Sequence, residues 1–191
     1  MNDISPDFKL EDNLKDKDVV LDILQYEATP AAIQVFAKRS SELMDYSYWF
    51  LLGTLWVSYS GWSDLNLWKR LLRSTRNRRQ TSLMKPSEIN EFGKLPATLK
   101  VYRAHRIGET DWISYTLDAE IAKRFALERD VDQISEYKIK KKDVVALFLR
   151  RGEQEVILLD KKKAKFIGNH SIINIGTRSD NYAAQTNNQR H

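Results

Sequence analysis

The sequence predicts an α+β fold in which an α-helical N-terminal region precedes a β-rich core. Across residues 17–80, apolar side chains recur at helical spacing. Across residues 98–175, short apolar runs are separated by polar turns, a pattern typical of strands. The stretch between them, residues 80–97, contains two prolines and a glycine, which favours a linker with one short helix. We expect the helical region to pack on the core.

The N-terminal region contains signals for several helices. Residues 1–16 are polar, so we expect a flexible N-terminus. The apolar repeat in residues 17–25 predicts a short helix, and Pro30 suits the first turn of a second helix that runs to about residue 44. Ser63 or Asp64 can cap a further helix. The apolar positions of that helix are Leu65, Leu67, Trp68, Leu71 and Leu72.

The β-rich core is expected to contain a series of short strands and one helix. Asp118 can accept hydrogen bonds from the first backbone N–H groups of a helix with the sequence AEIAKRFALE. Residues 176–191 are rich in Asn, Gln and Arg, and we expect them to form a loose tail. The predicted strands span residues 98–104, 112–116, 134–139, 144–149 and 155–159.

The composition excludes several kinds of site. The chain has 191 residues and no cysteine, which rules out disulfides and cysteine-ligated zinc and fits a cytoplasmic protein. No two of the three histidines have metal-ligand spacing, so we expect no metal site. The longest apolar run, residues 48–57, is about half of the roughly 18 residues that a membrane span needs, and the N-terminus lacks the features of a signal peptide. We expect no contact with a membrane.

The formal charge of +5 is unevenly distributed, and residues 69–79 form a dense basic segment. Such a segment is most simply a solvated face. Alternatively, it contacts nucleic acid or an acidic protein. Its basic residues are Lys69, Arg70, Arg73, Arg76, Arg78 and Arg79.

Most aromatic residues are expected in the core. Residues 46–74 contain four of the five tryptophans, and we interpret these rings as core rather than as a ligand platform. Trp112 is also expected to be a core residue. His105 follows Arg103 on the same strand face, and we expect it to be a surface histidine.

The strongest signal for function is a pair of glutamates, Glu153 and Glu155. Residues two apart on a strand point to the same face. The apolar run that follows, residues 156–159, predicts a buried strand. Carboxylates are normally kept out of a buried sheet, so a pair that enters one indicates a functional site.

Two further patterns precede this pair. Arg103 lies on the first predicted strand of the core, and Ser114 and Thr116 lie on the second. The order of an arginine, Ser-x-Thr and Glu-x-Glu resembles the Arg-Ser-Glu class of the ADP-ribosyltransferase superfamily, which includes the cholera-toxin-like and ecto-enzyme members. The resemblance covers about residues 98–160.

The resemblance implies a split β-sandwich and the use of NAD as a substrate. Cleavage of the nicotinamide–ribose bond passes through an oxocarbenium-like state, which a carboxylate stabilises. By resemblance, Glu155 holds the ribose and stabilises this cation, and Glu153 positions the acceptor. A glutamate at the first position is usual in members that modify arginine. The positions that resemble the NAD-binding residues of the family are Arg103, Tyr102, Ser114, Thr116 and Phe125.

The resemblance therefore implies an NAD-dependent mono-ADP-ribosyltransferase that modifies an intracellular macromolecule, with a preference for protein arginine. A phage-encoded factor that acts on host machinery or defence is one such enzyme. An NAD glycohydrolase is an alternative, because the same residues serve when water is the acceptor. A second alternative is a non-catalytic module that binds nucleic acid or an acidic protein through residues 69–79.

Overall fold

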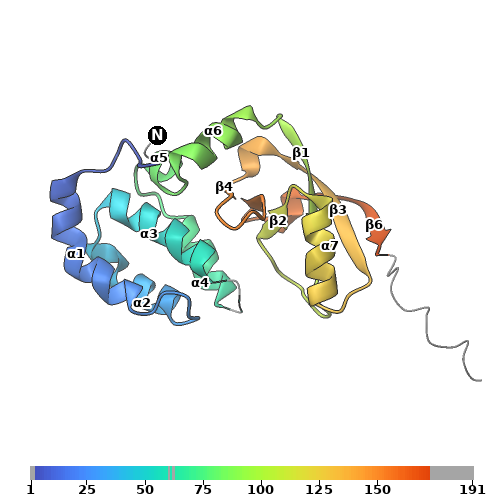
Figure 1. Ribbon diagram of the computed structural model, residues 1–191, viewed down its shortest axis with the longest axis horizontal. Helices are drawn as coiled ribbons and strands as arrows, with labels where there is room; N and C mark the ends of the chain where they lie inside the picture. The colour runs from blue at the N-terminus through green and yellow to red at the C-terminus, as the bar shows by residue number, and fades with distance from the viewer. Residues whose placement is uncertain (1–2, 60, 62, 173–191) are drawn as a thin grey trace, which may run out of the picture.

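The computed structural model describes residues 3–59, 61 and 63–172. It combines helices with an antiparallel sheet, which confirms the α+β prediction. The predicted tail, residues 176–191, lies outside the described residues. The helices are α1 (Leu10–Leu24), α2 (Ala32–Arg39), α3 (Asp45–Ser58), α4 (Leu65–Leu72), α5 (Arg79–Ser82), α6 (Pro86–Lys94) and α7 (Ala119–Glu128), with the short 3-10 helices η1 (Ser40–Glu42), η2 (Lys141–Asp143) and η3 (Lys161–Lys163). Helices α1–α6 form one half of the molecule, and the sheet with α7 forms the other (Figure 1).

Helix α3 lies at the centre of the helical half. Apolar side chains surround it on nearly all sides, as expected for a helix that is buried by its neighbours. Gly53 allows a close approach of the chain after α5, because a Cβ at this position would collide with the carbonyl oxygen of Leu83. The helix predicted for residues 30–44 is shorter in the structure, since α2 gives way to η1 and the chain is extended at Leu43 and Met44.

Helix α1 includes residues 10–16, so the prediction of a flexible segment is wrong for these residues. The buried carboxylate of Asp16 accepts hydrogen bonds from the backbone N–H of Met44, the residue before α3. The hydroxyl of Ser5 donates to the carbonyl oxygen of Thr81 at 2.7 Å. These polar side chains bind distant backbone groups rather than water, which composition alone does not reveal.

The strands form a sheet in the order β4-β5-β2-β1-β3-β6, and all neighbouring pairs are antiparallel. The strands are β1 (Thr98–Arg103), β2 (Ser114–Thr116), β3 (Gln133–Lys140), β4 (Ala146–Phe148), β5 (Glu155–Ile157) and β6 (Lys165–Ser171). Each predicted strand is present, although β2, β4 and β5 are shorter than predicted. The sequence missed β6, because this edge strand is largely exposed and lacks the apolar alternation of a half-buried strand.

The sheet is narrow at its middle. Strands β1 and β2 share a single register pair, Tyr102 with Thr116, whereas β1 and β3 are paired along their whole length. The sheet therefore divides into a half with β4, β5 and β2 and a half with β1, β3 and β6. Side chains at the end of β1 and on β2 lie where these two halves separate.

Helix α7 and the helical half both pack on the sheet. Ala122 and Ala126 of α7 pack against Ala104 and Ile134. A continuous apolar core joins the helical half to the sheet. Residues of this core that are essentially inaccessible to solvent include Ile23, Phe36, Trp49, Leu52, Val101, Val156 and Ile157.

Helix α6 lies in the segment predicted as a linker with a short helix, and its Glu88 connects the two halves. The carboxylate is 1% exposed and accepts hydrogen bonds from the backbone N–H groups of Lys85 and Leu149, at 2.8 and 2.9 Å. The guanidinium of Arg150 donates to it at 3.1 Å. A single buried carboxylate thus caps α6 and holds the segment between β4 and β5.

We expect the substitution Glu88→Ala to lower the free energy of unfolding by about 3–5 kcal/mol, because it leaves a buried arginine and two backbone donors without their acceptor. Glu91→Ala on the same helix is the matched control. Glu91 is exposed and pairs with Lys94, so its loss should cost less than about 1 kcal/mol. Urea unfolding of both variants measures the difference, and equal losses would contradict the assignment.

Candidate active site

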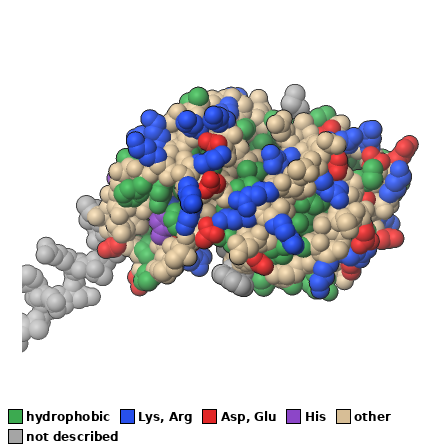
Figure 2. All heavy atoms as spheres, turned by 180° about the vertical axis from the view of Figure 1, so that it is seen from behind, with side chains coloured by type: hydrophobic (Ala, Val, Ile, Leu, Met, Phe, Trp, Pro, Cys, Tyr) green, Lys and Arg blue, Asp and Glu red, His purple; other side chains and the backbone are tan. Residues whose placement is uncertain are grey.

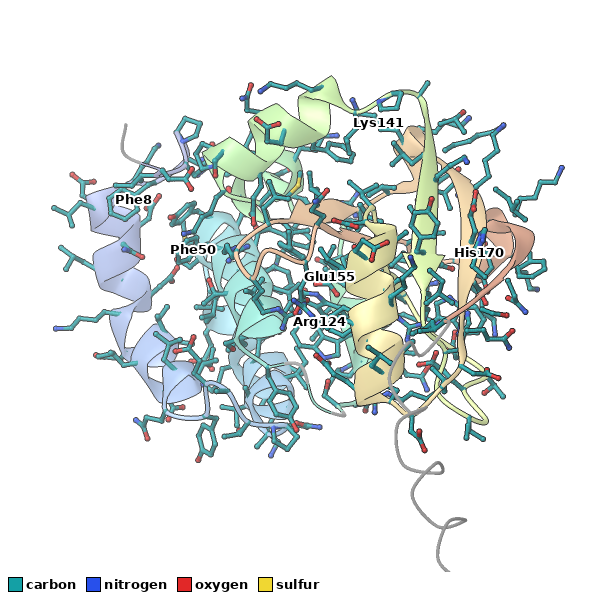
Figure 3. All side chains as sticks on the ribbon, turned by 45° about the vertical axis from the view of Figure 1, so that its right-hand side comes forward. Phe8, Phe50, Arg124, Lys141, Glu155 and His170 are labelled. Carbon is teal, nitrogen blue, oxygen red and sulfur yellow. The ribbon has the colours of Figure 1, made fainter. Side chains whose placement is uncertain are left out.

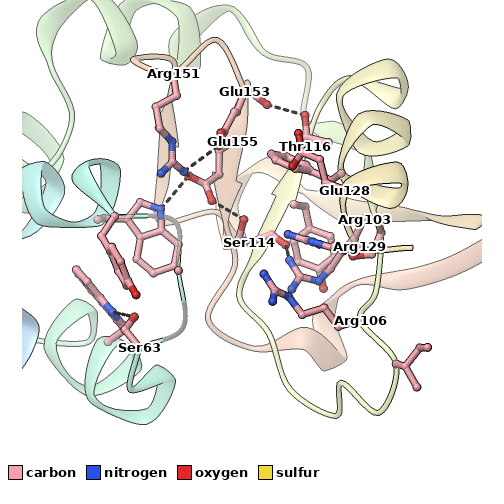
Figure 4. A pocket seen from close by; sticks show the side chains of 18 residues that line it. Ser63, Arg103, Arg106, Ser114, Thr116, Glu128, Arg129, Arg151, Glu153 and Glu155 are labelled. Atoms are coloured by element: carbon pink, nitrogen blue, oxygen red, sulfur yellow. Dashed lines mark hydrogen bonds and ion pairs between the residues drawn. The ribbon is translucent and has the colours of Figure 1, made fainter. Parts of the chain in front are cut away.

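A cavity of about 530 Å³ lies between the helical half and the sheet, beside α7 (Figure 4). Its walls come from α3 and the loop after it, from β1, β2 and α7, and from the turn before β5. Figure 3 shows Glu155 near the middle of the molecule, between the helical half and α7. The predicted site residues that line the cavity are Arg103, Ser114, Thr116, Phe125, Glu153 and Glu155.

The carboxylate of Glu155 is held by side chains from three separate segments. The hydroxyl of Ser114 on β2 donates to Oε1 at 2.5 Å, and the indole Nε1 of Trp56 on α3 donates to Oε2 at 2.8 Å. In the turn before β5, Nη2 of Arg151 lies 3.3 Å from Oε2. The side chain of Glu155 is 9% exposed. Both carboxylate oxygens are therefore oriented within a site that is largely shielded from water.

Burial raises the pKa of Glu155, because a carboxylate loses its hydration there. The hydrogen bonds from Ser114 and Trp56 and the charge of Arg151 oppose this rise, while the nearby charge of Glu153 adds to it. A poorly hydrated carboxylate interacts strongly with a positive charge that develops beside it. Glu155 is thus suited to stabilise a cationic transition state.

Glu153 lies in a constrained turn immediately before β5. The residue between the two glutamates, Gln154, has a φ of +46°, in the left-handed region that residues other than glycine rarely adopt. The hydroxyl of Thr116 donates to the carbonyl oxygen of Glu153 at 2.7 Å, so β2 helps to fix the turn. Nη2 of Arg151 contacts the carboxylates of both Glu153 and Glu155. The two carboxylates therefore lie at the same end of the cavity because Arg151 contacts both, and not because both glutamates are on one strand as predicted, since β5 begins only at Glu155.

The guanidinium of Arg103 donates three hydrogen bonds inside the protein. Its Nε and Nη2 donate to the two oxygens of Glu109 at 3.0 and 2.6 Å, and its Nη1 donates to the carbonyl oxygen of Ser114 at 2.7 Å. The side chain is only 12% exposed. This geometry gives Arg103 a positioning role, because it fixes the backbone of β2 where Ser114 meets Glu155. Its contact with a dinucleotide stays a prediction.

Glu109 is the centre of a polar network that the sequence did not indicate. Nδ1 of His105 lies 3.0 Å from Oε2 of Glu109, and Nε2 of His105 lies 2.8 Å from the hydroxyl of Tyr137. Burial would raise the pKa of Glu109, but the hydrogen bonds and charges of His105 and Arg103 outweigh burial and lower this pKa to about 2. His105 therefore contacts Glu109, the partner of Arg103, and it is not among the residues that line the cavity.

The end of the cavity near α7 is cationic. Arg106 and Arg129 line it together with Arg103, as Figure 4 shows. Nη1 of Arg129 donates to the carbonyl oxygen of Ala104, and the ring of Phe125 lies 5.1 Å from its guanidinium carbon. Burial, together with the charges of Arg103 and Arg106, lowers the pKa of Arg129 to about 10. Arginines that repel one another beside a cavity favour an anionic ligand.

Tyr102 is not part of the cavity lining. Successive strand residues point to opposite faces, and Tyr102 packs with the small apolar cluster around Ala104 and Ala126 beneath α7. Its ring also lies 6.5 Å from that of His170 on β6. Tyr102 therefore lies next to Thr116, its register partner on β2, but outside the cavity lining. Phe125, by contrast, lines the cavity.

Most of the basic segment at residues 69–79 has partners within the protein. Lys69 forms an ion pair with Asp111, and Arg76 donates to the carbonyl oxygens of Ser40 and Leu43. Arg73 and Arg79 likewise donate to main-chain carbonyl groups. On the face seen in Figure 2, Lys and Arg side chains stand in several groups with acidic side chains between some of them. These contacts favour a structural use of the segment over a single basic surface.

Comparisons with protein-family models, with curated proteins and with solved structures give no match. Within the described ranges, no three His, Asp or Glu side chains gather as metal ligands. In the same part of the chain, no helix has both the length and the apolar composition to cross a bilayer. Function is therefore inferred from the residues around the cavity.

Several residues around the cavity were not identified from the sequence. Trp56 was interpreted as core, and its indole N–H is instead one of the donors to Glu155. The signal available was its amphipathic ring, since buried indoles need a hydrogen-bond acceptor. Arg151 lies only two residues before Glu153, but spacing alone does not show that its side chain folds back over both glutamates.

The Arg103–Glu109 pair gives a pH-dependent prediction. Because the folded-state pKa of Glu109 is about 2, below its ordinary 4.5, its stabilisation is present above about pH 5 and lost as pH falls from 4.5 toward 2. We expect Glu109→Gln to cost about 3 kcal/mol of unfolding free energy at neutral pH and much less at pH 3. Glu120→Gln, on an exposed α7 position, is the control. Urea unfolding across this pH range measures both, and a deficit independent of pH would contradict the assignment.

Proposed function

We propose that this protein is an NAD-dependent mono-ADP-ribosyltransferase. One observation carries the proposal. The three patterns on which the family resemblance depends are far apart in the sequence, yet Arg103, Ser114 and Glu155 meet at one cavity in hydrogen-bonded contact. Nothing in the apolar pattern of the strands requires this convergence. A buried carboxylate held by Ser114 and Trp56 beside an arginine cluster is the arrangement that NAD cleavage needs.

The roles follow from the geometry. As the bond between nicotinamide and ribose breaks, positive charge develops on the ribose, and the carboxylate of Glu155 stabilises it. Ser114 and Trp56 keep that carboxylate in one orientation, so little reorganisation accompanies the reaction. Glu153, at the same end of the cavity, accepts a proton from the attacking acceptor. Arg103 fixes the strand that carries Ser114.

The cationic end of the cavity suits the diphosphate of NAD. Arg129 and Arg106 lie on the α7 side, and the planar fork of a guanidinium matches phosphate oxygens. Because Arg103 is occupied by Glu109, these two arginines are better placed than Arg103 to meet phosphate. The aromatic side chains of Tyr59 and Phe125 also line the cavity and offer flat surfaces for the rings of the dinucleotide.

The fold is compatible with the split β-sandwich of this superfamily, since the sheet is joined at its middle by one register pair. The acceptor under this proposal is an intracellular macromolecule, with protein arginine favoured because Glu153 is a carboxylate. A phage factor directed at host machinery or defence is consistent with this activity. The absence of cysteine fits a reducing cytoplasm.

The test is the release of nicotinamide from NAD and the transfer of labelled ADP-ribose to a cell lysate. We expect Glu155→Gln to reduce nicotinamide release by at least about 100-fold, because the charge that stabilises the transition state is lost while the shape is kept. Thermal unfolding should show that the variant is folded, since neutralising a buried carboxylate removes a desolvation cost.

The matched variant Glu153→Gln separates the two enzyme readings. For a transferase, it should lose transfer to protein while retaining nicotinamide release to water. If the wild type releases nicotinamide without labelling any macromolecule, the glycohydrolase alternative holds. If wild type and Glu155→Gln are equally inactive toward NAD and neither binds it, the proposal fails.

The cationic end gives a second prediction. Arg129→Met should raise the KM for NAD by about tenfold or more with a smaller change in kcat, because the lost contact is to phosphate and not to the reacting ribose. Arg124→Met on the outer side of α7 is the control and should leave both constants near the wild-type values. A loss confined to kcat would contradict a phosphate role.

A further inference from the structure

Arg151 occupies the position that an acceptor is expected to take. Its Nη2 lies 2.8 Å from Oε2 of Glu153 and 3.3 Å from Oε2 of Glu155. Its Nη1 donates to the carbonyl oxygen of Val57 at 3.0 Å, so the guanidinium is held from both sides of the cavity. Figure 4 shows the side chain above Glu155, directed into the site. One nitrogen thus contacts both of the residues that carry the proposed chemistry.

The neighbouring arginine shows that this placement is particular to Arg151. Arg150 turns away and forms a buried ion pair with Glu88, which anchors the segment to α6. Arg151 is 25% exposed and lines the cavity. Gly152 follows it with a φ of +67°, a left-handed turn that reverses the chain and places Arg151 over the glutamates. Arg150 therefore anchors the segment, while the next residue, Arg151, faces the cavity.

We propose that Arg151 is a site of self-ADP-ribosylation, in which this chain is its own first acceptor. The inference rests on the proposed function. Its basis is the shared contact of Nη2 with Glu153 and Glu155, since an acceptor nitrogen must lie within reach of both the proton-accepting carboxylate and the ribose that Glu155 faces. A guanidinium held in this place reacts as an intramolecular group, which favours it over free acceptors and over water.

The reaction balances without any further reagent. The bond between the pyridinium nitrogen and the anomeric carbon of NAD breaks, and nicotinamide leaves as a neutral molecule with the bonding electron pair. Nη2 of Arg151 forms a new bond to that carbon. The guanidinium gives up one proton, which passes to Glu153 and then to water. The product retains the positive charge of the guanidinium and carries ADP-ribose at Arg151.

Modification at this position has a consequence for the site. The adduct would lie over Glu153 and leave less room for a second acceptor. The reaction is therefore self-limiting, with at most one ADP-ribose on Arg151 of each chain. Modified Arg151 would no longer contact Val57 on α3 and Glu153 at the same time. The helical half and the turn before β5 would then lose the interaction that Arg151 makes between them.

The experiment incubates the full chain with NAD labelled in its adenylate part and maps the adduct by mass spectrometry. In the wild type, we expect ADP-ribose on the peptide that contains Arg151, at a rate constant that does not change on tenfold dilution of the protein. Arg151→Lys keeps the charge and should reduce self-labelling by at least about tenfold. Arg124→Lys should label within about twofold of the wild type, because Arg124 lies outside the cavity lining.

A mixing experiment tests whether the transfer is intramolecular. Glu155→Gln, labelled uniformly with 15N, supplies a chain with an intact Arg151 and no activity, and the unlabelled wild type supplies the active site. When the two are mixed, Arg151 of the inactive chain should remain unmodified. Its modification at the wild-type rate would overturn the intramolecular step.

Nicotinamide release is measured in every sample, which distinguishes a failure of self-modification from a failure of the proposed function. If release occurs and depends on Glu155, but Arg151 of the wild type carries no adduct, the self-modification inference is wrong and the proposed function stands. If no nicotinamide is released, both fail. Circular dichroism of Arg151→Lys confirms folding, and mapping of the wild type needs no variant.

Discussion

The arrangement of this protein depends on one buried carboxylate. Glu155 receives hydrogen bonds from Ser114 in the sheet and from Trp56 in the helical half, and it contacts Arg151 in the turn beside it. Each partner comes from a segment whose position is set by different packing. Burying a carboxylate is unfavourable, and its pKa is raised accordingly. These contacts keep it oriented in spite of that cost, so the helical half is part of the site rather than an appended module.

The arginines around the cavity divide into those that hold the structure and those that face the ligand. Arg103 pairs with the largely buried Glu109 and fixes β2, the strand beside Glu155. Arg150 pairs with the buried Glu88 and fixes the segment before Glu155. Arg106 and Arg129 lie at the opposite end of the cavity from Arg151. Under the proposed function, the phosphates of the dinucleotide are remote from its reactive ribose, so positive charge is needed at the end of the cavity away from Glu155. The positions of Arg106 and Arg129 would meet this need.

The parts of the fold and site that depend on local sequence could be predicted. Asp64 and Asp118 cap α4 and α7 as their spacing indicated, since a cap needs only its own neighbours. Glu155 could be chosen because a carboxylate that enters a buried strand is rarely accidental, and Ser114 was chosen from its place in the order that resembles the family. Tyr102 was chosen for its place beside Arg103, and it packs beneath α7 next to Thr116, outside the cavity lining.

The rest could not be predicted because it depends on contacts between distant segments. Asp16 and Trp56 both bind groups that lie far along the chain, and neither their type nor their local pattern names the partner. The same limit applies to Arg103, which the pattern assigned to the dinucleotide and which Glu109 occupies. Three hydrogen bonds to Glu109 and to the carbonyl oxygen of Ser114 set the position of this guanidinium, so Arg103 also fixes the strand that carries Ser114. The motif residues Arg103, Ser114 and Glu155 therefore meet at one cavity, while the hydrogen bonds, which the motif does not show, decide which of these side chains are held by partners within the protein.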